Sequence, residues 1–303
     1  MRVAVTGAAG LLGWSLVRVL SERGHTVVAG VHRRSLAGSG DLTVCALDLT
    51  DDDSIGRFVE AVSADCLIHA AAMTHVDRCE TEPALAERLN AIATTRLVDA
   101  VDDSDTRIVY VSTDFVFDGE GGPYVEDDPV HPLNVYGRTK LAGEEAVRRA
   151  DDRHAIVRAA GFLGVGDPEH PTFVETMLAS MKANPPLCAA GDQRSNITPV
   201  GYLAAALVEI AERALGGTWH VAGREVVSRY ELARRLAVLW HLPESSVQDM
   251  PYAALDRPAR RPLNGGLCVD KAAARLRVTA PSLDESLATW KCELDAAGGL
   301  SVE

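Results

Sequence analysis

The feature that most constrains the fold is an alternation of short, β-rich runs with helical patterns through the first half of the chain. Such an alternation is typical of a parallel sheet that carries helices on its faces. Apolar residues make up 47% of the 303 positions and aromatic residues only 5%, the usage expected of helices that cover a buried sheet. We therefore expect an α/β protein with strands at residues 2–6, 26–31, 43–47, 66–69, 107–111 and 154–158.

The second half of the chain loses that rhythm and contains several proline-containing loops. One more strand is predicted at residues 218–222, and Ser228 with Glu231 forms a capping box in front of a helix. We expect a first domain over residues 1–160 and a smaller α/β domain mainly over 161–303, with the chain returning to the first domain around 190–223.

The charge and the cysteines exclude several classes of protein. A net charge of -13 argues against sequence-independent binding of nucleic acid or of anionic lipid. No apolar run approaches membrane-spanning length, and the N-terminus lacks the pattern of a signal peptide. The six cysteines follow no C-x-x-C or disulfide framework and fit reduced thiols. We expect a cytoplasmic protein without nucleic-acid or membrane partners, and the sequence leaves a homodimer open.

A glycine-rich loop follows the first predicted strand directly and leads into a helix. Glycines there let the backbone turn tightly and approach a pyrophosphate, whose charge is met by the N–H groups and dipole of the helix N-terminus. The spacing is G-x-x-G-x-x-G rather than G-x-G-x-x-G, and a plain glycine-rich turn is the alternative. The loop predicts a dinucleotide site at Gly7, Gly10, Leu11, Leu12 and Gly13.

The second strand ends in His32-Arg33-Arg34, where an NAD-binding protein usually carries an acidic residue for the ribose hydroxyls. Guanidinium groups supply forked donors for a 2′-phosphate, so the sequence favours NADP(H) over NAD(H). A solvated loop charge is the alternative for one of these arginines. Asp48, with Leu49 beside it, is placed to accept from an adenine amino group, and a plain helix N-cap is the alternative for Asp48.

Tyr136 and Lys140 are four residues apart in a segment with helical character, so both side chains project from one face. A nearby ammonium group stabilises a phenolate and lowers the phenol pKa, which is ordinarily about 10. The pair predicts a tunable proton donor, with a solvated helix face as the alternative. The fifth strand ends in Ser112-Thr113, and ligands of open α/β sheets bind beyond the carboxyl ends of strands, so either hydroxyl could bind a substrate carbonyl.

Residues 5–13, 112–119 and 136–144 resemble extended short-chain dehydrogenase/reductases of the dTDP-4-dehydrorhamnose reductase type. Further landmarks at 69–72, Asp77, Asn90, 191–193 and 259–262 extend this resemblance over nearly the whole chain. It implies a Rossmann-like, doubly wound parallel sheet that binds NADP, a small C-terminal sugar-nucleotide domain, and a catalytic triad of Thr113, Tyr136 and Lys140. It also implies cofactor contacts at Ala70, Ala71 and Ala72, and substrate contacts at Thr74, Thr113, Asp114, Phe115, Gly161, Phe162, Arg194 and Arg260.

The activity that the resemblance implies is NADPH-dependent reduction of a nucleotide-linked 4-keto-6-deoxy sugar, with Tyr136 as proton donor and Lys140 also holding the nicotinamide ribose. Arg194, Arg260 and Arg261 are candidates for the substrate diphosphate, with surface or interdomain ion pairs as the alternative. An epimerase or dehydratase that retains its nicotinamide is one rival interpretation. A non-catalytic regulator, like the regulatory subunit of methionine adenosyltransferase, is another. His75, Asp77, Cys79 and Glu80 meet no metal-site spacing, so no metal is expected.

Two stretches depart from the family pattern, both on the expected substrate side. Gly161 stands where the family carries a Trp near the sugar, and residues 194–199 replace a Gly-x-Pro-Thr stretch. From the first departure we expect a wider pocket, filled by a larger or differently oriented substrate, by Phe162, or by a loop of the second domain.

Overall fold

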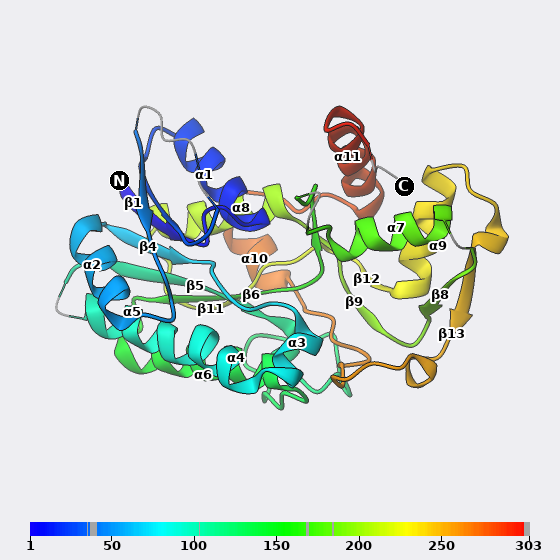
Figure 1. Cartoon of the computed structure of the whole chain (residues 1–303), viewed down its shortest axis with the longest axis horizontal. Coiled ribbons are helices and arrows are strands. Elements are labelled where there is room, and N and C mark those ends of the chain that lie inside the picture. Colours follow the sequence, from blue (N-terminus) through cyan, green and yellow to red (C-terminus); the bar gives the residue numbers. More distant parts are fainter. Residues whose placement is uncertain (35, 37–40, 103, 168–169, 184, 300–303) are drawn as a thin grey trace.

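The computed structural model describes residues 1–34, 36, 41–102, 104–167, 170–183 and 185–299. Its centre is a seven-stranded sheet in the order β11-β6-β5-β4-β1-β2-β3, and all neighbouring strands in it are parallel (Figure 1). The strands are β1 (Arg2–Thr6), β2 (Thr26–Val31), β3 (Leu42–Ala46), β4 (Cys66–His69), β5 (Arg107–Thr113), β6 (Ala155–Ala159) and β11 (Gly217–His220). The strand order reverses between β1 and β4, which is where doubly wound sheets bind ligands. The expected Rossmann-like α/β fold is confirmed.

All seven predicted strands are present, with ends that differ by one or two residues. The largest difference that bears on function is in β5, which continues to Thr113 instead of ending at Val111. From Ile108 onward β5 is buried, as expected of a central strand covered on both faces. This extension carries Ser112 and Thr113 to the carboxyl edge of the sheet.

Helices cover both faces of the sheet. On one face α1 (Leu11–Glu22) packs along α8 (Val200–Glu212), and α10 (Asp270–Arg275) joins the same apolar core through Ala272. On the other face lie α2 (Asp52–Val62), α5 (Ala93–Val101) and α6 (Val135–Ala150), whose core includes Phe58, Leu97 and Val147. Between β4 and α5 the chain forms α3 (Val76–Thr81), α4 (Pro83–Glu87) and a π-helical turn (Arg88–Ile92).

A second apolar core lies beside the sheet, around Leu178, Leu236 and Trp290. It is formed mainly by α7 (Phe173–Ala183), α9 (Arg229–Leu239) and α11 (Leu283–Ala296). The expected capping box of Ser228 and Glu231 is confirmed at the start of α9. Three two-stranded pairs complete this part: β7 (Phe162–Leu163) with β10 (Thr198–Pro199), β9 (Arg194–Asn196) with β12 (Val226–Ser228), and β8 (Leu187–Ala190) with β13 (Val247–Met250).

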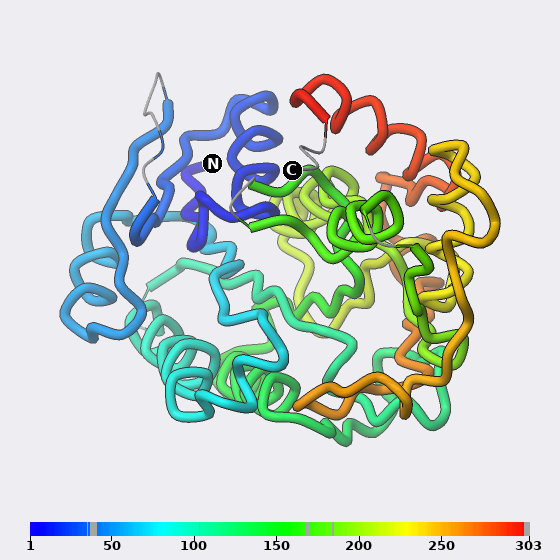
Figure 2. Tube along the Cα trace, turned by 45° about the vertical axis from the view of Figure 1, so that its right-hand side comes forward, coloured from blue at the N-terminus to red at the C-terminus, as the bar shows by residue number. Residues whose placement is uncertain are grey.

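The chain passes between the two cores more than once. Although α8 and β11 follow β9 in sequence, they pack in the sheet-bearing part. After β13, the orange segment in Figure 2 returns to the vicinity of α3 and α6, where Arg261 pairs with Asp77 and the Arg260 carbonyl accepts a hydrogen bond from Asn134. The domain boundary near residue 160 stays a prediction. Within the described ranges, no helix is both long and apolar enough to cross a membrane.

Candidate active site

The glycine loop between β1 and α1 is shaped by close backbone contacts. Gly7 has φ +66°, and a Cβ added there would lie 2.9 Å from the Cα of Ala71. A Cβ at Gly13 would overlap the Gly7 carbonyl oxygen, so no larger residue fits without a backbone shift. Helix α1 begins after Gly10 with no side-chain cap and no acidic residue in its first turn. Its free N–H groups and dipole therefore fit the pyrophosphate of a dinucleotide.

The residues proposed to select NADP lie at the end of β2. Arg33 is exposed, and one guanidinium nitrogen of Arg34 lies 3.3 Å from a carboxylate oxygen of Asp167. His32 Nε2 lies 3.3 Å from Asp48 Oδ2. Both arginines thus follow the carboxyl end of β2, but the charge of Arg34 is already close to the carboxylate of Asp167.

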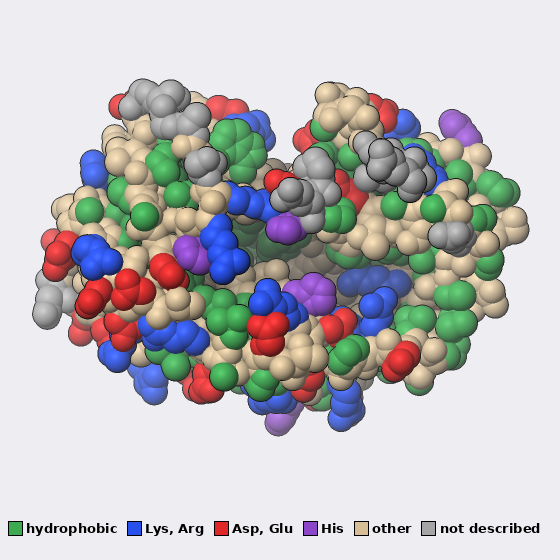
Figure 3. All heavy atoms as spheres, viewed as in Figure 1, with side chains coloured by type: hydrophobic (Ala, Val, Ile, Leu, Met, Phe, Trp, Pro, Cys, Tyr) green, Lys and Arg blue, Asp and Glu red, His purple; other side chains and the backbone are tan. Residues whose placement is uncertain are grey.

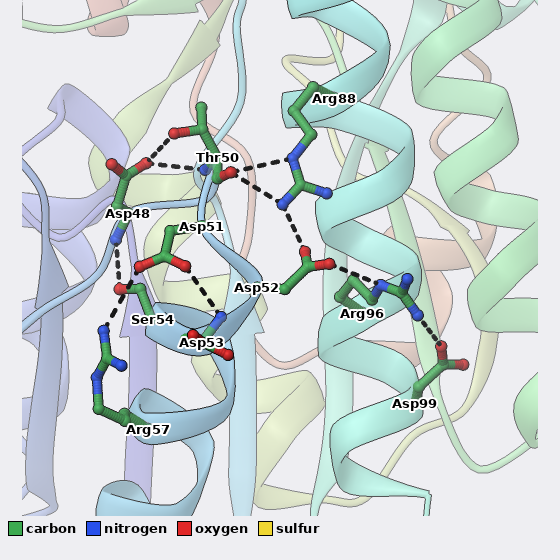
Figure 4. Close-up of polar contacts among 10 residues, drawn as sticks. All are labelled: Asp48, Thr50, Asp51, Asp52, Asp53, Ser54, Arg57, Arg88, Arg96 and Asp99. Atoms are coloured by element: carbon green, nitrogen blue, oxygen red, sulfur yellow. Dashed lines mark hydrogen bonds and ion pairs between the residues drawn. The ribbon is translucent and has the colours of Figure 1, made fainter.

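Asp48 and Leu49 follow β3, and Figure 4 shows Asp48 with the acidic residues that come after it. Asp48 Oδ1 accepts hydrogen bonds from the Thr50 N–H at 2.8 Å and the Thr50 hydroxyl at 2.7 Å, which lower the pKa of its carboxyl together with His32. The alternative of Asp48 as helix N-cap is wrong, because Asp51 caps α2 through the N–H of Asp53. The Leu49 side chain is buried in the core, so only its backbone could reach a cofactor.

The proposed catalytic residues meet at the carboxyl edge of the sheet. Asn134 caps α6 by accepting from the Gly137 N–H at 2.8 Å, which places Tyr136 and Lys140 one turn apart on a buried face. The Thr113 hydroxyl lies beside the Tyr136 phenol, whose pKa it lowers, and the Phe115 ring packs edge-on against Tyr136. Thr113, Tyr136 and Lys140 therefore lie together, as the resemblance implies.

The structure distinguishes the two hydroxyls at the end of β5. Ser112 donates a 2.5 Å hydrogen bond to Glu144, a fully buried carboxylate that also forms two hydrogen bonds with Arg158. Ser112 is thus bound beneath α6, away from Tyr136. Thr113 is the hydroxyl that contacts Tyr136.

Burial dominates the electrostatics of Tyr136 and Lys140. It raises the pKa of the Tyr136 phenol above its ordinary value, and the neighbouring Thr113 hydroxyl opposes that rise. Burial also lowers the pKa of Lys140 to about 7, against the favourable charge of Glu144. The pKa of Tyr136 is therefore raised rather than lowered, because burial is the largest effect on it, and a lowering by Lys140 stays a prediction. The Lys140 Nζ lies 4.0 Å from the centroid of the buried Tyr110 ring.

Asp114 links the catalytic edge to the second part of the chain. Its carboxylate accepts from the Ser195 hydroxyl at 2.9 Å and from the Thr113 hydroxyl at 3.1 Å. Burial raises the pKa of Asp114 to about 6, opposed first by these two hydrogen bonds and then by Arg229. Ser195 comes from the stretch that departs from the family pattern, and its role could not be read from the sequence.

The expectation of a widened pocket at Gly161 is wrong. Gly161 has φ +51°, and a Cβ there would overlap the backbone carbonyl oxygen of Asn196, with Ile197 next to it. A side chain at this position would meet β9 rather than a sugar. Phe162 does not fill such a hole either, because it lies in β7 beside Thr198 and packs against the sheet core.

Of the remaining substrate candidates, two carry a charge that is already paired. Arg194 lies 3.4 Å from Glu231, and Arg261 binds Asp77 through both guanidinium nitrogens at 2.9 and 2.8 Å. Arg260 is exposed, as is Thr74 on the loop after β4. Ala70, Ala71 and Ala72 begin that loop, and Ala71 touches Gly7.

The residues weighed as metal ligands have separate partners. His75 caps α3, Asp77 binds Arg261, and Glu80 accepts from the Val135 N–H at 3.0 Å. In the ranges that the structure describes, no group of three His, Cys, Asp or Glu residues could hold a metal ion.

Two hollows border the site. A cavity of about 610 Å³ lies between α1 and α11, against Gly10, Leu11 and Arg34, but does not reach Tyr136. Figure 3 shows a second, wide hollow between the two parts of the molecule, with Lys, Arg and His side chains around it.

Comparisons with known proteins agree with this geometry. The family described as RmlD substrate binding domain matches residues 1–294. The chain is 33% identical to a protein of Haloferax volcanii named as a probable low-salt glycan biosynthesis reductase, Agl14, over 95% of this chain and 96% of that one. It is 34% identical to the dTDP-4-dehydrorhamnose reductase of Mycolicibacterium smegmatis, over 86% of this chain and 76% of that one.

Other relatives bear on the cofactor and on the rival interpretations. A dTDP-4-dehydrorhamnose reductase structure from Bacillus anthracis, in complex with NADP, superposes with a TM-score of 0.84 at 27% identity and covers 96% of this chain and 99% of that one. The β subunit of methionine adenosyltransferase 2 from Xenopus laevis is 30% identical over 85% of this chain and 78% of that one. The chain therefore belongs to the RmlD substrate binding domain family, an extended short-chain dehydrogenase/reductase-like family that includes the dTDP-4-dehydrorhamnose reductases.

Proposed function

We propose that the chain is an NADPH-dependent reductase of a nucleotide-linked 4-keto-6-deoxy sugar, with Tyr136 as proton donor. The observation that carries this proposal is the contact of Thr113 with Tyr136, one helical turn from Lys140, at the edge of the sheet that also carries the glycine loop. The relatives named as dTDP-4-dehydrorhamnose reductases support the substrate class. The cytoplasm as location, the domain boundary near residue 160 and a homodimer belong to the same proposal.

NADPH, when bound, supplies the hydride that reduces the keto carbon to an alcohol carbon. Thr113, whose hydroxyl donates to Asp114 in this structure, would turn that hydroxyl towards the carbonyl oxygen and so stabilise the negative charge that develops there. Tyr136 gives its phenolic proton to that oxygen, which yields the alcohol, and its phenolate then regains a proton from solvent. Burial disfavours the phenolate, so the Lys140 ammonium, one helical turn away, would be needed to offset the charge left on Tyr136.

The glycine loop and the end of β2 would hold the cofactor. The N–H groups at the start of α1 bind the pyrophosphate, and Arg33 and Arg34 bind the 2′-phosphate that distinguishes NADPH from NADH. The NADP complex of the Bacillus anthracis relative supports this preference. Lys140 would also hold the nicotinamide ribose, and Ala70, Ala71 and Ala72 would line the cofactor beside Gly7, which Ala71 contacts.

A panel of dTDP-, UDP- and GDP-linked 4-keto sugars tests the proposal. We expect one of them to consume NADPH in a one-to-one ratio with the alcohol product, followed by NADPH absorbance and product analysis. An epimerase or dehydratase would convert substrate without net consumption of added NADPH. The similarity to the methionine adenosyltransferase subunit favours a regulatory role as a second candidate, which predicts NADPH binding without turnover of any sugar.

A further inference from the structure

Arg229, the first residue of α9, is a half-buried cation close to the catalytic edge. Its Nη1 is buried and has no hydrogen-bond partner in the part of the chain that the structure describes. The guanidinium group lies on the Phe173 ring, with the Cζ atom 4.4 Å from the ring centroid. The backbone N–H of Arg229 donates to the Gln193 carbonyl at 3.0 Å, which fixes the position of the residue.

The charges around Arg229 come from both parts of the molecule. Asp114, at the end of β5, raises the pKa of its guanidinium, while Arg261 lowers it. Burial is the largest effect and brings that pKa to about 10, so the group is charged at neutral pH. Arg229 lies near Asp114, but the described residues show no hydrogen bond or ion pair between them. The Asp114 carboxylate is instead bound by Ser195 and Thr113.

Arg194 and Arg261 differ from Arg229 in having acceptors of their own. Arg194 is beside Glu231 and Arg261 is held by both oxygens of Asp77. Leaving a buried donor unpaired costs about 1–3 kcal/mol, and more for a charged group, so such groups are rare in native proteins. A ligand that supplies the acceptor accounts for the position of Arg229.

We propose that Arg229 binds an anionic group of the substrate, which is either a phosphate of the nucleotide or a carboxylate on the sugar. A hydroxyl of the same substrate, next to that anion, donates a hydrogen bond to Asp114. This inference rests on the proposed function. A guanidinium fork matches the paired oxygens of either anion. The neighbouring Asp114 carboxylate favours a ligand that carries a hydrogen-bond donor beside its negative charge. Phe173 keeps the fork in one orientation by stacking on its face.

Calorimetric titration with chosen probes tests the inference. The probes are UDP and dTDP, the corresponding nucleosides, UDP-glucose and UDP-glucuronic acid. If the anion is a phosphate, Arg229→Gln weakens UDP and dTDP binding by about 10-fold or more and leaves nucleoside binding unchanged. If the anion is a carboxylate, UDP and dTDP bind as before, and the variant loses only the advantage of UDP-glucuronic acid over UDP-glucose.

Two variants control for indirect effects. Arg234→Gln removes a cation from the same helix, but Arg234 is exposed and paired with Glu244, so its titrations should match the wild type. Arg229→Lys keeps the charge but not the fork and should bind with intermediate affinity. NADPH titration and the Tm of each variant show that the fold is intact.

Two further outcomes would count against the inference. Equal affinities of wild type and Arg229→Gln for every probe overturn it and leave the proposed function standing. A wild-type protein that binds none of the probes and reduces no 4-keto sugar overturns the proposed function and this inference together.

Discussion

The proposed pyrophosphate site lies in one short segment, residues 7–13, and consists largely of backbone N–H groups. The proposed substrate end consists of side chains from segments far apart in sequence, namely Asp114, Ser195 and Arg229. The first arrangement depends on the glycines at which the chain turns. The second depends on how two apolar cores, with different helices, are placed against each other.

This difference has a physical consequence for substitution. Backbone groups cannot be replaced by mutation, so the pyrophosphate site changes only when a side chain is forced into its turn. At the substrate end each contact belongs to one side chain and can change alone. We therefore expect single substitutions to change substrate preference more readily than the chemistry proposed at Tyr136.

The largest expected effect is at Tyr136, where the two ends meet. Tyr136→Phe removes the proton donor but leaves the glycine loop intact. We expect turnover of the authentic sugar to fall about 10²- to 10⁴-fold, with an almost unchanged Kd for NADPH. Steady-state kinetics and NADPH fluorescence titration measure the two quantities. Lys140→Ala should damage both, and near wild-type turnover by Tyr136→Phe would exclude the mechanism.

The second prediction concerns cofactor preference. Neutralising Arg33 and Arg34 together removes donors to the 2′-phosphate, so the Kd of NADPH should rise about 10- to 100-fold while that of NADH stays the same. Higher salt should weaken NADPH binding to the wild type. Equal affinity of the wild type for NADPH and NADH would show that Arg33 and Arg34 do not select the 2′-phosphate. Asp167→Asn is the matched variant and should strengthen NADPH binding, because it removes the acidic neighbour of Arg34.

The cofactor end could be predicted because its signals are local. The loop at 7–13 follows a strand and precedes a helix, and the Tyr136–Lys140 spacing fixes one helix face. The distinction between Ser112 and Thr113 was not local, since it depends on Glu144 of α6, which is held by Arg158 of β6. The resemblance pointed to Thr113, and the structure shows the reason.

The substrate end could not be predicted, because its contacts also join residues that are far apart in sequence. Nothing in the sequence around Ser195 or Arg229 shows that they approach Asp114. The expectation at Gly161 failed because it assumed that a glycine in place of the family Trp leaves an empty space. The backbone of Asn196 lies where a side chain at this position would point. Arg194 and Arg261 were chosen for charge, and their partners Glu231 and Asp77 lie elsewhere in the sequence.

The third prediction tests the turn itself. A Cβ at Gly13 would overlap the Gly7 carbonyl oxygen, so Gly13→Ala should cost about 1–3 kcal/mol of stability and weaken NADPH binding. Gly201→Ala is the control, because a Cβ there meets nothing within 4 Å and lies in α8, where Ala is favoured. Chemical denaturation and NADPH titration measure both effects. Equal stability of the two variants would mean that the loop relaxes freely.

The smallest expected effect lies beneath Lys140. The Tyr110 ring faces the Lys140 ammonium at 4.0 Å, in a site where burial lowers the pKa of Lys140 to about 7. The other titratable groups that bear on the ammonium are Glu144, which raises its pKa, and His69, whose own pKa is lowered to about 3 by burial and by Lys140. An aromatic face stabilises a desolvated cation by up to about 2 kcal/mol, so the ring should keep Lys140 charged.

Tyr110→Leu removes the aromatic face, and Tyr110→Phe keeps it while removing the hydroxyl that donates to the Lys140 carbonyl. The protonated lysine is the active form, so kcat declines as pH rises through its pKa. Loss of the ring lowers that pKa and moves the decline to lower pH by about one unit, which reduces kcat severalfold near neutrality. Tyr110→Phe should keep the wild-type profile. A Leu variant with the wild-type pH profile and a folded core would show that the ring only packs against Lys140 and does not hold its charge.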